Sequence, residues 1–202
     1  MSQAAETIVR EIIGTHKAMV AEFEQTEVAV LVDIATMIAE TFKAGGTVYL
    51  CGNGGSAADA QHIAGEMVGR FQSERRALPA VALSTDTSVL TCVANDYNYE
   101  SVFARQTEAL LRQGDVLWAI STSGRSANVV KAVEVAKGKG ARVVAFTGRK
   151  NSTVEGLADL CLCADASLTA RSQEIHQLAY HIICDLVERR FAEQVEQLID
   201  AG

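Results

Sequence analysis

The chain has 202 residues, 49% of them apolar and 21% charged, which is the composition of a folded domain that can bury a core of its own. Its 18 basic and 25 acidic residues give a formal charge of −7, which argues against a nucleic-acid surface because such a surface needs a basic stripe. No signal-peptide pattern and no apolar run of ~18 residues is present, and the five cysteines lie mostly in apolar runs, so we expect a cytoplasmic protein with reduced thiols that does not enter a membrane.

Helical periodicity without a proline runs through residues 3–43 and predicts an N-terminal helical segment. Its apolar residues form two stripes, so we expect two helices that are separated near residues 24–27. Gly45 and Gly46 then end the second helix. The first stripe contains Ile8, Ile12, Ile13, Met19, Val20 and Phe23, and the second contains Val28, Leu31, Val32, Ile34, Ile38 and Phe42.

Short apolar runs alternate with helical patterns through the rest of the chain. Continuous apolar runs without period-two alternation are typical of strands covered on both faces, which predicts a parallel sheet in an α/β fold. With no linker-like stretch, we expect a single domain over 1–202, with its α/β core at 47–165 and a C-terminal helix at 169–198. Strands are predicted at 47–51, 79–84, 115–121, 142–148 and 159–164. The other helices are predicted at 56–70, 86–94, 98–112, 126–139 and 152–157.

Two polar, glycine-rich turns follow predicted strands, at Cys51–Ser56 and Ser121–Ser126. Ligands of parallel α/β folds bind beyond the carboxyl ends of the strands, where the strand order reverses. A turn of this kind leaves backbone N–H groups and a positive helix end free for an anion. Two such turns favour a ligand with a phosphate at one end and hydroxyl groups elsewhere, such as a sugar phosphate.

The first turn also matches the G-x-G-x-x-A pattern of dinucleotide sites, at Gly52, Gly54 and Ala57. A dinucleotide site expects an acidic residue about 20 residues further on, at the end of the second strand. Here Asp86 follows about 30 residues on, so the sequence does not favour a dinucleotide. A turn that serves only the strand-to-helix geometry stays open as an alternative.

The second turn places four hydroxyl groups within six residues, on Ser121, Thr122, Ser123 and Ser126, at the start of a predicted helix. Hydroxyl and backbone N–H groups at a helix start form a neutral phosphate cradle that needs no Walker-type lysine and no metal. Capping of the helix alone would use one hydroxyl rather than four. The sequence therefore favours phosphate binding here.

Two predicted helices carry residues that can transfer protons or bind a metal. His62 and Glu66 are four residues apart and share a helix face. On the final helix Gln173, Gln177 and His181 step by four and line one side. Because His181 lies in an apolar run, it could equally be a core histidine, and periodicity alone leaves both interpretations open.

Four motifs stand in order along the chain: Cys51–His62, Ala94–Tyr97, Ile120–Gly124 and Ala170–His176. Together they resemble the phosphoheptose isomerases, a family of the sugar isomerase (SIS) superfamily, and the likeness covers nearly the whole chain. The resemblance implies a flavodoxin-like SIS fold, in which a parallel five-stranded sheet lies between helices, with N-terminal helices and a long C-terminal helix. It also implies a homotetramer with active sites at the subunit interfaces.

The family converts sedoheptulose 7-phosphate to D-glycero-D-manno-heptose 7-phosphate, the first step toward ADP-heptose. By resemblance, Glu66 and His181 are the catalytic acid–base pair. The resemblance also implies one zinc ion (Zn²⁺) per subunit, bound by His62, Glu66, Gln173 and His181. The substrate-binding positions that it implies are Asn53, Gly54, Gly55, Glu66, Asn95, Asp96, Ser121, Thr122, Ser123, Ser126 and Gln173.

This reaction moves a proton between C1 and C2 of the sugar through an enediol. It needs one group that takes a proton from carbon and a partner that serves the oxygens or the adjacent carbon, and a partly buried carboxylate with an imidazole suits both tasks. Zinc beside the carbonyl would polarise it. Glu66 cannot be a tightly held zinc ligand and a free base at once, so the sequence leaves its role open.

Small departures and three other readings remain. Arg125 stands where many relatives have asparagine, and Ala170 replaces an acidic residue of some relatives.

A non-catalytic SIS paralogue that binds the replication initiator lacks the carboxylate and imidazole at Glu66 and His181, so the resemblance favours an enzyme. A sensor of phosphosugars would need a DNA-binding domain, for which this chain has no room. Another phosphorylated sugar stays open as the substrate.

Overall fold

The computed structural model describes residues 2–200, with the side chains of residues 3–192. Residues 1, 201 and 202 of the expected single domain therefore lie outside the described part. The strands are β1 (Val48–Gly52), β2 (Ala80–Ala82), β3 (Val116–Ser121), β4 (Arg142–Thr147) and β5 (Leu160–Cys163). The helices are α1 (Ser2–Thr26), α2 (Val28–Lys43), α3 (Gly55–Val68), α4 (Thr87–Asp96), η1 (Tyr99–Ser101, a 3-10 turn), α5 (Val102–Leu110), α6 (Ala127–Gly138), α7 (Thr153–Leu157) and α8 (Thr169–Asp200).

These bounds lie within two residues of the sequence-based predictions, with one exception. The helix predicted over 98–112 is divided into η1 and α5. Asn98 is extended, and the Ser101 backbone N–H donates to the Asn98 carbonyl oxygen in an i→i+3 bond of 3.2 Å, while the Ser101 hydroxyl donates to the Asn98 side chain. These bonds tighten the first turn into a 3-10 geometry. None of the described helices is both long enough and apolar enough to cross a lipid bilayer.

The five strands form one fully parallel sheet in the order β2-β1-β3-β4-β5. This is the flavodoxin-like order, so the predicted parallel five-stranded sheet is confirmed. The strand order reverses between β1 and β3, and the two glycine-rich turns follow these two strands. Both turns therefore lie at the place where ligands bind in this fold.

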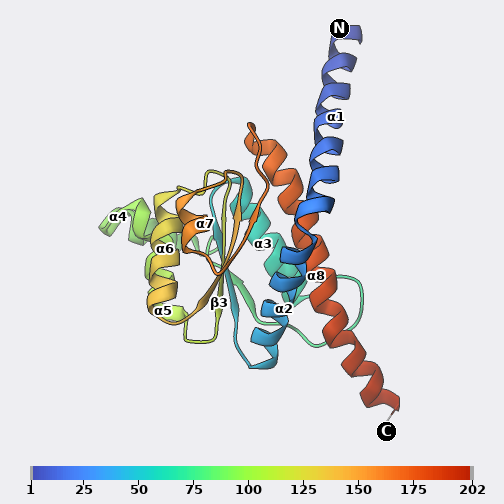
Figure 1. Cartoon of the computed structure of the whole chain (residues 1–202). Coiled ribbons are helices and arrows are strands. Elements are labelled where there is room, and N and C mark those ends of the chain that lie inside the picture. The colour runs from blue at the N-terminus through green and yellow to red at the C-terminus, as the bar shows by residue number, and fades with distance from the viewer. Residues whose placement is uncertain (1, 201–202) are drawn as a thin grey trace.

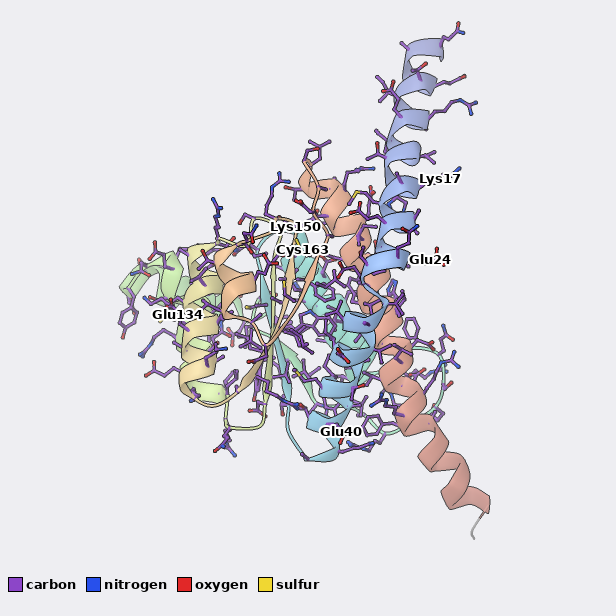
Figure 2. The ribbon with its side chains drawn as sticks, in the orientation of Figure 1. Lys17, Glu24, Glu40, Glu134, Lys150 and Cys163 are labelled. Carbon is purple, nitrogen blue, oxygen red and sulfur yellow. The ribbon has the colours of Figure 1, made fainter. Side chains whose placement is uncertain are left out.

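Helices cover both faces of the sheet (Figure 1). Along β3, Trp118 and Ile120 pack into the core that α2, α3 and α8 complete, while Leu117 and Ala119 pack into the core on the side of α5, α6 and α7. In Figure 2, Glu40 on α2 and Glu134 on α6 lie on opposite sides of the sheet. Burial on both faces explains why the strand sequences are continuous apolar runs rather than alternating ones.

A buried carboxylate joins α8 to the chain segment that follows α3. The Glu188 carboxylate accepts hydrogen bonds of 2.6 to 2.7 Å from the backbone N–H groups of Phe71, Gln72 and Ser73. It also lies 3.5 Å from the guanidinium Nε of Arg75. The other two guanidinium nitrogens of Arg75 donate to the backbone carbonyls of Gly69 and Glu66. Glu66 lies in the last turn of α3 and Gly69 caps the end of this helix, so the Glu188–Arg75 pair fixes the end of α3 against α8.

We expect Glu188→Gln to lower the free energy of unfolding by about 3 kcal/mol at pH 7, because the amide presents a donor to buried N–H groups and to Arg75. Burial raises the pKa of Glu188, but the backbone N–H groups of Ser73, Phe71 and Gln72 and the charge of Arg75 outweigh it, so the pKa lies below its usual value. A lowered pKa stabilises the fold above the unfolded-state value, and this contribution is lost as the pH falls through the folded-state pKa.

Urea unfolding over a pH series measures both effects, and the difference between wild type and Glu188→Gln should shrink below about pH 4. The matched control is Glu40→Gln, which removes an exposed carboxylate 3.2 Å from Lys43 and should change stability by less than about 1 kcal/mol. Equal unfolding curves for the two variants would show that the buried carboxylate does not hold α8 in place.

Candidate active site

The turn after β1 is built around glycine backbone conformations. Gly54 has φ +57°, a value that favours glycine, and it directly precedes α3. A Cβ at Gly52 would overlap the backbone of Ser56, because the chain returns closely on itself here. The glycines therefore serve the geometry of the turn, and the first backbone N–H groups of α3 lie at the carboxyl edge of the sheet.

Asn53 in this turn is held by side chains that sequence reasoning missed. Its amide and the amide of Asn128 exchange two hydrogen bonds, of 2.8 and 2.9 Å, and the Tyr99 hydroxyl donates to Asn53 Oδ1 at 3.0 Å. Asn128 lies buried in the first turn of α6. The pair joins the two turns directly, although 75 residues separate them in the sequence.

Three of the four expected phosphate-binding hydroxyls come together in the turn after β3. The Ser121 and Ser126 Oγ atoms are 3.1 Å apart, and Ser123 Oγ lies 3.4 and 3.5 Å from them. Ser126 occupies the N-cap position of α6, but its hydroxyl makes no capping hydrogen bond. Plain N-capping therefore does not explain this serine, and the start of α6 keeps N–H groups that can face an anion.

Within the described part of the chain, Thr122, Asn95 and Asp96 make no hydrogen bond to these three hydroxyls. Thr122 and Ser123 line a cavity of about 110 Å³ together with Gly148 and Ser172, and the Thr122 carbonyl accepts from the Gly148 N–H at 2.9 Å. Asn95 and Asp96 are exposed in the last turn of α4, where the Asn95 amide donates to Asp96 at 2.9 Å. Helix α4 ends two residues beyond the predicted end at residue 94.

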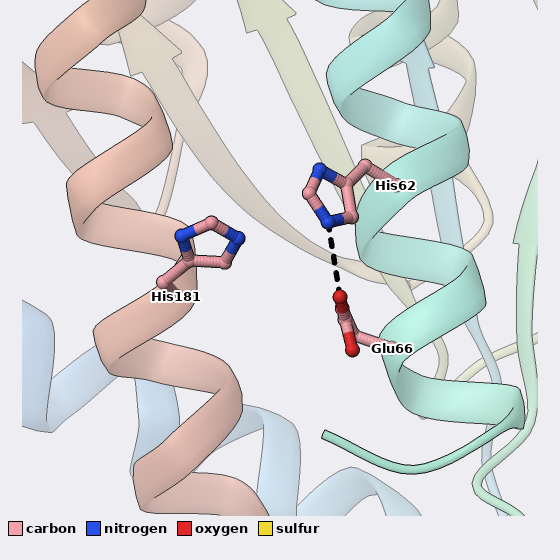
Figure 3. Close-up of side chains that lie close together, drawn as sticks. All are labelled: His62, Glu66 and His181. Atoms are coloured by element: carbon pink, nitrogen blue, oxygen red, sulfur yellow. Dashed lines mark hydrogen bonds and ion pairs between the residues drawn. The ribbon is translucent and has the colours of Figure 1, made fainter. Parts of the chain in front are cut away.

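His62, Glu66 and His181 meet between two helices. His62 and Glu66 project from α3 and His181 from α8, and the three side chains turn toward one another (Figure 3). His62 Nε2 lies 2.9 Å from Glu66 Oε1, and the His62 and His181 rings are 5.1 Å apart between centroids. One ligand atom from each of the three residues can be chosen so that all lie within 4.8 Å of one another.

The surroundings of this cluster shift the pKa values of two of its groups. Burial lowers the pKa of His181, and the neighbouring His62 lowers it further, while Glu66 partly opposes the shift. His181 is therefore the neutral imidazole at pH 7 and can accept a proton. Asp59, one turn before His62, has a pKa raised to about 6, because burial outweighs the effect of His62. Sequence reasoning missed Asp59.

The donor set of the cluster suits zinc, which prefers histidine nitrogen and carboxylate oxygen ligands. The imidazoles and the carboxylate lie close enough to share one ion. Gln173, the fourth expected ligand, places its amide against Gly55, where a Cβ would overlap it. Gln177 and His181 line a groove of about 480 Å³ between α1 and α8. The remaining lining residues of this groove are Ile12, Ile13, His16, Arg171, Glu174 and Leu178.

Within one chain, the His62–Glu66–His181 cluster and the serine hydroxyls of the turn after β3 lie at different heights along the axis of α3. Glu66 is eleven residues beyond Gly55, which corresponds to about 16 Å along the axis of α3. The helix starts at the carboxyl edge of the sheet, and the segment after it leads to β2 at the amino edge. The structure thus brings Glu66 to His181, but not to the Ser121–Ser126 turn of the same chain.

A parallel sheet of this order, with a hydroxyl-rich turn at the reversal, fits the class of SIS-domain proteins. Residues 13–148 match the SIS domain family. A phosphoheptose isomerase from Roseiflexus sp. (strain RS-1) is 53% identical over 170 residues, which are 84% of this chain and 86% of that protein. The chain belongs to the phosphoheptose isomerase family, whose members exchange the aldose and ketose forms of a sugar phosphate.

Solved structures agree with this assignment. The structure of a phosphoheptose isomerase from Neisseria gonorrhoeae superposes with a TM-score of 0.87 at 40% identity, over 92% of this chain and 99% of that one. A phosphoheptose isomerase from Francisella tularensis gives a TM-score of 0.88 at 30% identity, over 94% and 100% of the two chains. The likeness therefore extends over nearly the whole chain.

We expect Gly55→Ala to leave the fold intact, because the new Cβ meets only the end of the flexible Gln173 side chain, which can swing aside. Moving Gln173 should lower isomerase turnover by roughly tenfold or more. Steady-state kinetics together with thermal unfolding measure the two effects. The matched control is Gly65→Ala on the same helix, where a Cβ meets nothing within 4 Å. This substitution should stabilise the helix and leave turnover unchanged. Full turnover in Gly55→Ala would show that the position of Gln173 is unimportant.

Proposed function

We propose that this chain converts sedoheptulose 7-phosphate to D-glycero-D-manno-heptose 7-phosphate by acid–base proton transfer, as the first step of ADP-heptose formation for lipopolysaccharide. The observation that carries the proposal is the meeting of Glu66 and His181, which are 115 residues apart in the sequence, in a chain that is 53% identical to a phosphoheptose isomerase. The five free cysteines suit an enzyme of the reducing cytoplasm.

In the proposed mechanism, the Glu66 carboxylate takes the proton from the carbon next to the carbonyl. The neutral His181 imidazole moves a proton from one sugar oxygen to the other, so that an enediol forms. Glu66 then returns its proton to the neighbouring carbon as the enediol collapses to the other carbonyl form. Both side chains are partly buried. Each positioned acid or base of this kind typically supplies ~10²–10⁴ in rate.

His62, Glu66 and His181 would hold one zinc ion per chain. The proposed fourth ligand is Gln173, whose amide lies against Gly55 at the start of α3. Zinc bound there would supply Lewis-acid polarisation of the carbonyl and of the developing enediolate. Without the metal, His62 Nε2 lies 2.9 Å from Glu66 Oε1, and this contact orients the carboxylate. Because Glu66 cannot be a tightly held zinc ligand and a free base at once, either its carboxylate would shift during turnover or zinc would serve partly to stabilise the site.

The phosphate end of the substrate is proposed to bind the turn after β3. Ser121, Ser123 and Ser126 present their hydroxyls within 3.5 Å of one another beside the uncapped start of α6. Backbone N–H groups and the positive helix end stabilise the negative charge there. Asn53 and the glycines Gly54 and Gly55 would bind the sugar on the neighbouring turn, with Thr122, Asn95 and Asp96 at the periphery.

We propose that the active site is completed in a homotetramer, with the phosphate turn of one copy facing the acid–base pair of another. The separation along α3 within one chain supports this arrangement. The first half of α1 extends past the sheet (Figure 1) and exposes 56% of Ile8, 45% of Ile12 and 49% of Ile13. An exposed apolar stripe of this length is typical of a protein–protein interface.

The alternative, a non-catalytic adaptor for the replication initiator, receives no support from the relatives, which are phosphoheptose isomerases. The chain also keeps both residues that the resemblance takes to be missing from such an adaptor. The imidazole of His181 and the carboxylate of Glu66 lie in one cluster rather than apart on the surface. An enzyme explains this arrangement, and an adaptor does not require it.

We expect Glu66→Gln and His181→Gln each to lower kcat by roughly 10²–10⁴, because each removes one proton-transfer group while keeping a similar shape. A coupled assay of sedoheptulose 7-phosphate isomerisation measures kcat and KM. Glu134→Gln, an exposed carboxamide substitution on α6, is the matched control and should keep the wild-type rate. Undiminished turnover in both Glu66→Gln and His181→Gln would refute the acid–base assignment.

For zinc, we expect about one ion per chain in protein purified without chelator, and a strongly reduced content in His62→Gln. Elemental analysis of the purified proteins measures the metal content. Chelator-treated protein should lose activity and regain it when zinc is added back. Full activity of the zinc-free protein would count against a catalytic role of the metal and leave the proton-transfer assignment to be judged by the kinetic variants.

A further inference from the structure

The hydroxyl of Tyr180 lies against the nitrogen of His62 that faces away from Glu66. Tyr180 is almost fully buried on α8, directly before His181. Its hydroxyl oxygen is 2.9 Å from His62 Nδ1, and Nε2 of the same ring is 2.9 Å from Glu66 Oε1. Both ring nitrogens of His62 therefore have a partner, and the ring is held from two sides.

The aromatic ring of Tyr180 also contacts both imidazoles of the cluster. Its centroid lies 5.3 Å from that of His62, at an angle of 70°, and 4.7 Å from that of His181, at 73°. Edge-to-face contacts of this geometry are favourable for aromatic rings. The packing keeps the phenol in place between α3 and α8, so its hydroxyl has little freedom to leave Nδ1.

The Tyr180 hydroxyl can act toward His62 as a donor or as an acceptor. A protonated phenol can donate to Nδ1 of His62, or rotate and accept from an Nδ1–H group. It therefore offers a partner to His62 both when Nε2 carries a proton and when Nε2 is bound to a metal.

We propose that Tyr180 is a positioning residue whose hydroxyl holds His62 with Nε2 turned toward Glu66 and His181. This inference rests on the proposed function, because the nitrogen so presented is the one that would bind zinc. Metal-binding histidines are commonly oriented through the second ring nitrogen, and loss of that partner typically costs roughly 10–100-fold in metal affinity or activity. Tyr180 has no contact role in the reaction itself and acts through His62.

The variant Tyr180→Phe tests the inference, because it removes only the hydroxyl and keeps the ring packing. The matched control is Tyr49→Phe on β1, which removes a hydroxyl that donates to the Leu110 carbonyl at 3.4 Å. Zinc affinity is measured on chelator-treated protein by competition with a chromogenic chelator. We expect the zinc Kd to weaken by roughly 10–100-fold in Tyr180→Phe and to stay unchanged in Tyr49→Phe.

A second measurement reports the orientation of His62 without any metal. NMR of zinc-free protein with ¹⁵N-labelled histidine, near pH 8 where an ordinary imidazole is neutral, identifies the protonated ring nitrogen. The His62 signal is assigned by its loss in His62→Gln. We expect one tautomer with the proton on Nε2 in the wild type, and a mixture of both tautomers in Tyr180→Phe. A merely structural tyrosine would lower the Tm and leave the tautomer unchanged.

Two results would overturn the inference. One is a wild-type tautomer in Tyr180→Phe together with a zinc Kd within about twofold of the wild type. The other is a mixture of tautomers in the wild-type protein, which can be observed whether or not the variant folds. A wild type that binds no zinc, but whose single tautomer is lost in Tyr180→Phe, would contradict the zinc site of the proposed function and still support orientation by Tyr180.

Discussion

The packing of α8 against α3 is the contact on which the candidate site depends. Ile63 and Met67 of α3 share one core with Ala179 and Ile183 of α8, and all four side chains are fully buried. The residues of the site lie on the flanks of these buried stripes, so the packing sets the distance between them. A shift of one helical turn would move His181 by about 5.4 Å and separate it from the other two residues of the cluster. The buried carboxylate of Glu188 opposes such a shift.

Most of the fold could be predicted from local pattern. Burial on both faces leaves strands as continuous apolar runs, and the glycines at the ends of β1 and α2 mark where the backbone must turn. The sequence could not show the division at Tyr99–Ser101, because it depends on hydrogen bonds between Asn98 and Ser101 rather than on periodicity. Short polar side chains compete with the helix for backbone hydrogen bonds at such boundaries, and composition alone does not show which hydrogen bonds form.

The site could be predicted less completely than the fold. The four-residue spacing of His62 and Glu66 reveals a shared helix face, because both residues lie on one element. Their meeting with His181 depends on packing between distant segments, and only the resemblance to a family suggested it. Tyr180 lies in an apolar run and looks like a core residue, so nothing local distinguishes its hydroxyl. Partners across the fold, such as Asn128 for Asn53, are equally invisible to helical spacing.

The two edge strands of the sheet are also its shortest, β2 with three residues and β5 with four. An edge strand offers unpaired backbone groups to other molecules, and a short one offers few of them. The large exposed apolar side chains of α1 lie on a helix instead. Contacts between copies in the proposed homotetramer would therefore use helix surfaces rather than strand edges, and would avoid the strand-to-strand growth that produces fibres.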